Sequence, residues 1–143
     1  MAIQGMFAVL MFKTGGVGGA GSWAELTNVR DVTLTVEAGE ADVTTRANSG
    51  WRATLATLKE GTLEFEMVWE PGDAGFEAIK DAFLTGGVIG LAALDSAGAT
   101  GEGLVADFSI TNFSRSEPLE EAITVSVTAK VAVFSEWTTS GVS

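Results

Sequence analysis

The sequence predicts a mainly β protein: an antiparallel β-sandwich or barrel with one flanking α-helix over about residues 73–85, in a single domain spanning residues 1–143. Two observations predict this class. Apolar and polar residues alternate in several segments, which is typical of half-buried strands. Only one segment shows helical spacing, so helices do not alternate with strands and a parallel sheet is not expected.

The first predicted strand covers residues 3–12, which are apolar on both faces. A glycine-rich segment follows, and we expect a flexible loop over residues 14–22. The next strand, residues 32–37, alternates strictly. One face carries Val32, Leu34 and Val36, and the other carries Thr33, Thr35 and Glu37.

A long polar loop is predicted over about residues 38–59. Within it Trp51, Leu55 and Leu58 fall at helical spacing, which suggests a short helical turn or a mobile flap. The following strand, residues 62–69, alternates again. Its inward residues are Leu63, Phe65, Met67 and Trp69, and its outward residues are Glu64, Glu66 and Val68.

The predicted helix begins after Asp73, a good N-cap residue, and ends at Gly86. Its apolar stripe consists of Phe76, Ile79, Phe83 and Leu84. Further strands are predicted at about 88–94, 103–111 and 122–134, followed by a loose tail at 138–143.

Composition excludes many kinds of chemistry. The chain has no histidine, cysteine or tyrosine, so it has no Ser-His-Asp triad, no thiolate nucleophile and no zinc site built from His or Cys. We expect no enzymatic activity, no metal and no cofactor. With 8 basic and 19 acidic residues, the formal net charge of −11 opposes binding to DNA or to an anionic membrane.

Three motifs allow a functional and a simpler interpretation. Gly16, Gly18 and Gly21 match a dinucleotide-binding pattern, but the next strand follows too soon for a crossover helix. Glu64 and Glu66 could act as paired catalytic carboxylates, although alternation already requires polar residues there. The tryptophans, Trp51 and Trp137 above all, could stack on sugars or anchor protein contacts, and we favour protein contacts.

Residues 29–69 resemble the tail tube (major tail) proteins of long-tailed bacteriophages. The shared series is D-V-T-L at residues 31–34, then E-x-x-E-x-D-V-T-T at residues 37–45, then G-W-R-x-x-L at residues 50–55. The resemblance continues through FEAIKDAFLTG at residues 76–86 and through residues 108–127.

This resemblance implies a β-sandwich whose copies form hexameric rings that stack into a hollow tube, made in the host cytoplasm and built into the virion tail. DNA passes through such a tube without specific binding. The implied partners are other copies of the chain and the tail-tip, tape-measure and tail-terminator proteins, with no membrane. A gene transfer agent tail is included in this prediction. The alternatives are a secretion-system tube subunit and a carbohydrate-binding β-sandwich.

The resemblance also implies that the loop at about residues 40–58 connects one ring to the next. The residues of this candidate inter-ring loop are Asp42, Thr45, Arg46, Trp51, Arg52 and Leu55. Because alternation turns them away from the core, the candidate lumen carboxylates are Glu37, Glu64, Glu66 and Asp107. An acidic lumen would offer phosphates no binding minimum.

Overall fold

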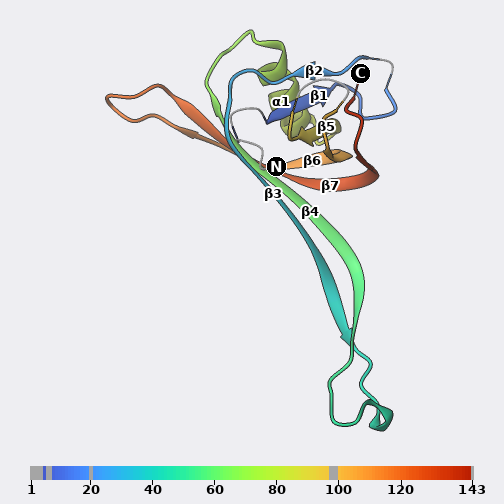
Figure 1. Ribbon diagram of the computed structural model, residues 1–143. Coiled ribbons are helices and arrows are strands. Elements are labelled where there is room, and N and C mark those ends of the chain that lie inside the picture. The colour runs from blue at the N-terminus through green and yellow to red at the C-terminus, as the bar shows by residue number, and fades with distance from the viewer. Residues whose placement is uncertain (1–4, 6–7, 20, 97–99, 143) are drawn as a thin grey trace.

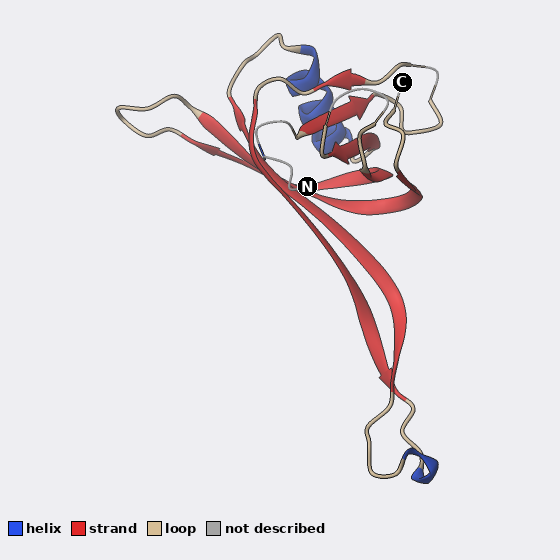
Figure 2. Ribbon diagram, in the orientation of Figure 1, coloured by secondary structure: helices blue, strands red, loops and turns tan. Residues whose placement is uncertain are grey.

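The computed structural model describes residues 5, 8–19, 21–96 and 100–142 (Figure 1). Within these residues one α-helix, α1 (Ala74–Thr85), and one short 3-10 turn, η2 (Arg46–Asn48), accompany seven strands. The strands are β1 (Val9–Lys13), β2 (Ala24–Glu25), β3 (Val29–Asp42), β4 (Thr54–Val68), β5 (Val88–Leu94), β6 (Gly103–Ser116) and β7 (Thr124–Thr138). The predicted fold class, mainly antiparallel β with one helix, is confirmed (Figure 2).

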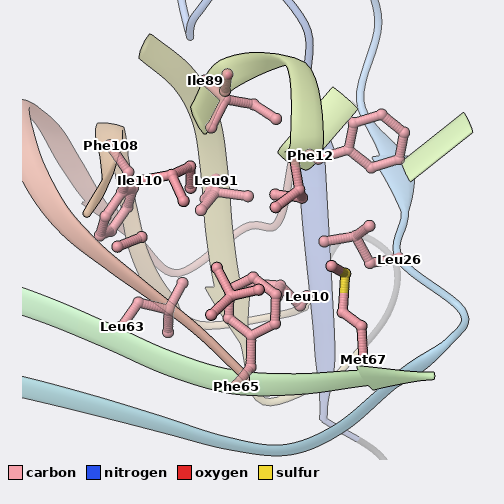
Figure 3. Close-up of a cluster of buried hydrophobic side chains, with 14 of the residues drawn as sticks. Leu10, Phe12, Leu26, Leu63, Phe65, Met67, Ile89, Leu91, Phe108 and Ile110 are labelled. Carbon is pink, nitrogen blue, oxygen red and sulfur yellow. The ribbon is translucent and has the colours of Figure 1, made fainter. Parts of the chain in front are cut away.

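The strands form one hydrogen-bonded sheet in the order β2-β1-β5-β6-β7-β4-β3, and every neighbouring pair is antiparallel. The sheet curls strongly. β1 and β4 are separated by three strands in this order, yet Leu10 of β1 lies beside Phe65 and Met67 of β4 in one core (Figure 3). This curvature lets a single sheet enclose its own apolar face.

Alternation decides which residues enter that core. Leu63, Phe65 and Met67 are buried, as predicted, and Trp69 just beyond β4 packs against the same cluster. Leu34 of β3 also packs against it, but Val36 is 54% exposed. Val36 pairs with Gly61, just beyond the last residue of β4 that pairs with β7, so the face of β3 that carries Leu34 and Val36 no longer has a core to cover at this point.

The helix begins and ends as predicted. The Phe76 amide donates to the Asp73 carboxylate over 3.1 Å, and Gly86 adopts the left-handed conformation (φ 72°) that ends many helices. Phe76 and Ile79 are buried against the sheet, but Leu84 is 69% exposed, so its place in the predicted apolar stripe is wrong. At 100° per residue, Leu84 is rotated by about 140° from Ile79 and faces away from the core.

Replacing Asp73 with alanine is expected to lower the free energy of unfolding by about 1 kcal/mol, because the amide of Phe76 loses its acceptor. Urea unfolding followed by circular dichroism measures the change. Asp81→Ala, within the same helix, is the control and should leave stability nearly unchanged. Equal losses in the two variants would contradict the capping role.

The first strand is shorter than predicted: β1 covers Val9–Lys13, and residues 3, 4, 6 and 7 of the predicted span lie outside the described residues. The predicted loop at 38–59 differs more. β3 continues to Asp42 and β4 begins at Thr54, so the loop shrinks to residues 43–53. The helical turn through Trp51, Leu55 and Leu58 is wrong, since both leucines lie in β4.

The described part of the connection between β1 and β2, residues 14–19 and 21–23, lies on the outer face of the sheet. Val17 and Trp23 pack there against Ala92, Leu94 and Val105, a second and smaller apolar cluster. The tail joins the same cluster through Val142, and the Gly141 amide donates to the Gly101 carbonyl over 2.9 Å. The tail that the sequence predicts to be loose therefore makes contacts up to Val142; Ser143 lies outside the described residues.

Candidate assembly surfaces

A long two-stranded hairpin projects from the body (Figure 1). We call residues 37–60 the arm. β4 pairs with β7 only over residues 62–68, so in the arm β3 and β4 have each other as neighbours and no third described strand. Their outer N–H and C=O groups are left without a sheet partner, and an isolated hairpin is at best marginally stable in water. The arm is therefore a surface that favours contact with another chain.

Large apolar side chains lie on this arm. Trp51 is 78% exposed, Leu55 58% and Leu58 86%. Exposed apolar side chains gathered on one projection are typical of protein contact surfaces. Trp51 and Trp137 do not form a common stacking platform: Trp51 lies beyond the strands of the arm, whereas Trp137, in β7, donates to Glu102 over 2.8 Å.

The predicted inter-ring residues separate into two groups. Thr45, Arg46, Trp51 and Arg52 line one open hollow, and we call residues 43–53 the arm tip. Asp42 and Leu55 lie at the ends of the strands that carry it. The hydroxyl of Thr44, and to a lesser extent its amide, donate hydrogen bonds to the Asp42 carboxylate and hold the pKa of Asp42 below its usual value. The same hydrogen bonds fix the start of the turn.

Three of the four predicted lumen carboxylates share one face of β3 and β4. Glu64 pairs with Thr33, Glu66 with Arg30, and Glu37 with Glu60. Cross-strand partners point to the same side of a sheet, and buried Leu63, between Glu64 and Thr62, marks the opposite side. Glu60 belongs to the same acidic face but is not among the residues predicted from the sequence. Extending the alternation of residues 62–69 by two residues toward the N-terminus would have identified it.

Asp107 lies apart from this acidic face. Its carboxylate accepts a hydrogen bond from the Val17 amide over 2.6 Å, and Lys13 Nζ donates to the Val17 carbonyl over 2.9 Å. The two contacts fasten the glycine-rich connection to the outer face of the sheet. Among the residues that the structure describes, no helix lies between the glycines and β2.

A second, shorter hairpin projects between β6 and β7 (Figure 1). We call residues 117–123 the β6–β7 tip. It carries Glu117, Glu120 and Glu121, and its Leu119 is 98% exposed. Arg115 pairs with Glu117 over 2.9 Å. No role for this segment is predicted from the sequence, although Pro118 and three glutamates between two alternating strands indicate an exposed turn.

No described helix has both the length and the apolar character needed to cross a bilayer.

The structure combines a curled antiparallel sheet, an arm whose two strands have no third described strand beside them, and exposed apolar side chains at two tips. These features define a class of structural β subunit that assembles with other chains. The chain belongs to the phage tail tube protein family, whose model matches residues 2–133. It is thus a structural subunit of a tail tube and part of the virion.

Solved structures show the same fold. The tail of an empty gene transfer agent (GTA) particle, refined with C6 symmetry, has a TM-score of 0.79 at 18% identity, covering 96% of this chain and 99% of that one. The native gene transfer agent virion gives 0.77 at 16% identity, with the same coverage. The SPP1 tail tube gives 0.77 at 18% identity, covering 99% and 81%. No match to a curated protein was found.

Proposed function

We propose that copies of this chain form hexameric rings, and that the rings stack into a hollow tube through which DNA leaves the particle. The observation that carries the proposal is the arm, in which two strands run beyond the body with no third described strand and with exposed Trp51, Leu55 and Leu58. The C6 symmetry of the similar gene transfer agent tail supports rings of six.

Ring closure has a physical route through the sheet edges. β3 is one edge of the described sheet and β2 is the other. Pairing an edge with a neighbouring copy satisfies its free backbone groups and extends the sheet around the ring, as in other contacts made by strand addition. Six curled sheets joined in this way would enclose a wide channel.

The arm connects successive rings in this proposal. Contact with the next ring covers the apolar side chains of the arm and supplies the packing that an isolated hairpin lacks. The tube also requires partners that the isolated chain does not contain: a tape-measure protein, and the tail-tip and tail-terminator proteins at its two ends.

The acidic face of β3 and β4 lines the lumen in this proposal. Glu37, Glu64 and Glu66 keep their proposed role and Glu60 joins them, whereas Asp107 serves to hold the Val17 connection. Nearby basic groups are few: Arg30 lies 3.8 Å from Glu66, and Lys130 neighbours Thr62 across the sheet. Phosphates therefore meet like charge, which prevents DNA from adhering to the wall.

Negative-stain electron microscopy of the concentrated, purified chain tests the proposal. We expect sixfold rings that join end to end as concentration rises. A chain that stays monomeric at every concentration, and that is missing from tailed particles made in its host, would refute it.

Replacing Glu64 and Glu66 together with lysine is expected to allow assembly but to slow DNA release, since cations in the lumen bind phosphates. The slowing should diminish as salt is raised, and Glu64→Gln with Glu66→Gln should give a smaller effect. A DNA-binding dye added to triggered particles reports the rate.

The matched control is Glu70→Lys with Asp81→Lys, which changes the net charge equally at exposed positions off β3 and β4. If the control slows release as much as the lumen variant does, or if neither changes the rate, Glu64 and Glu66 do not line the channel.

A further inference from the structure

We propose that successive rings are joined head to tail by two specific surfaces: the arm tip of one copy, with Arg46, Trp51 and Arg52, docks on the β6–β7 tip of a copy in the next ring, with Leu119, Glu120 and Glu121. This inference rests on the proposed function and names the partner of the arm. The partner is a second copy of the same chain.

The two tips lie at opposite ends of one strand. At one end of β4, Thr54 pairs with Asp42 beside the arm tip. At the other end, Val68 pairs with Thr124, which in turn pairs with Ser116 at the base of the β6–β7 tip. β4 has 15 residues, so the bases of the two tips are separated by about 50 Å along the strand direction. The hairpins therefore project in opposite directions (Figure 1).

These ends carry opposite charge. The charged residues of the arm tip are Arg46 and Arg52, and those of the β6–β7 tip are three glutamates. The arm tip is therefore positively charged, although the chain as a whole, with 8 basic and 19 acidic residues, is negatively charged. Arg46, Arg52, Glu120 and Glu121 form no ion pair with any residue that the structure describes, whereas Glu117 is already paired with Arg115.

The tips also complement each other in shape and polarity. Trp51 and the two arginines line an open hollow on the arm tip. Leu119 on the β6–β7 tip is apolar and 98% exposed, so its side chain is free to insert into the hollow and pack on Trp51. Tryptophan and arginine are enriched among residues that dominate binding energy at protein interfaces. The apolar pair would supply affinity, and the charges would supply orientation and discrimination between partners.

A contact between two different surfaces of the same subunit does not close on itself when the copies are related by translation along an axis, so it continues without limit. The reverse arrangement, arm tip against arm tip, places like charges together and is disfavoured. The charge pattern thus specifies both the stacking and its direction.

Charge exchange tests the contact in the full chain. Arg46→Glu with Arg52→Glu is expected to abolish stacking of rings, and so is Glu120→Arg with Glu121→Arg. The four-residue exchange should restore tubes, because the two tips are again complementary. Glu70→Lys with Asp81→Lys is the control, and it should form tubes as the wild type does.

Engineered cysteines give a second measurement, which is unambiguous because the chain has none of its own. Ala47→Cys lies on the arm tip and Ala122→Cys on the β6–β7 tip, both exposed. Under mild oxidation, a mixture of these two single variants should form cross-linked heterodimers, and the double variant should form a ladder of higher oligomers. Ala47→Cys mixed with Asp81→Cys should not cross-link.

The arm tip could instead dock in an open groove of the body. Four carboxylates line this groove, those of Glu25, Asp31, Asp95 and Glu102. Cross-linking of Ala47→Cys to Glu25→Cys instead of Ala122→Cys would overturn the inference. Tubes formed by both charge-reversed variants would overturn it as well. A wild-type chain that forms no rings or tubes would instead refute the proposed function, so the two failures are distinguishable.

Discussion

A variant in which Asn-Gly replaces residues 43–53 is expected to fold normally and to form rings that do not stack. Residues 43–53 contribute nothing to the buried core, and the cut falls at the paired residues Asp42 and Thr54, which a two-residue turn can join. The melting temperature should therefore stay close to that of the wild type. The loss should appear in electron micrographs as isolated rings in place of tubes.

A control separates the length of the arm from its chemistry. In the control, a glycine-serine segment of the same length replaces residues 43–53, which keeps the reach but removes Trp51, Arg46 and Arg52. We expect it to stack as poorly as the short variant. Long, regular tubes from the Asn-Gly variant would show that the arm tip does not connect rings.

Phe76→Ala is expected to destabilise the fold severely, and by more than the loss of the helix cap at Asp73. Phe76 is 1% exposed and meets the Trp69 ring edge-on, with 4.9 Å between ring centroids. Removing a buried phenylalanine side chain costs about 3–5 kcal/mol, a large fraction of the stability of a domain of this size. The melting temperature should fall by about 10 °C.

Phe83→Ala is the matched control, because it removes the same atoms from the same helix. Phe83 stacks on Phe113 at 5.9 Å but is 38% exposed, so its loss leaves a smaller cavity and should cost much less. Similar losses in both variants, measured by calorimetry, would contradict the prediction that the buried Phe76 side chain contributes more to stability than the half-exposed Phe83 side chain.

The sequence predicted well where one face of an element is buried. Alternation placed Leu63, Phe65 and Met67 in the core, and helical spacing with Asp73 placed α1. In these segments the apolar period reports directly on burial, so the pattern and the structure agree.

The arm could not be predicted in the same way. Both of its faces are exposed, so burial imposes no period of two on residues 38–42 or 54–59. Polar strands of this kind are specified by backbone pairing and by their partner strand, and a single sequence does not reveal that pairing. No role for the β6–β7 tip could be predicted for a related reason: its position at the end of β4 opposite the arm tip depends on the sheet order.

A β-bulge near the start of β3 is another feature that could not be predicted from the sequence. The register shifts by one residue between Arg30 and Thr33, and Asp31 within this bulge adopts a positive φ of 45°. Aspartate tolerates that conformation better than most residues, and an extra residue on one strand increases the local twist. The twist therefore increases within the body, several residues before the arm begins at residue 37.

β4 runs without interruption from the arm into the core, so in a tube whose rings are joined through the arm, as proposed above, a pull along the tail would load the subunit in shear. The hydrogen bonds that join β4 to β3 and β7 lie across the strand direction. Under such a load many of these bonds share the force and must rupture together. Tensile strength of the tail would then reside in the folded bodies, while bending would be accommodated at the joints between them.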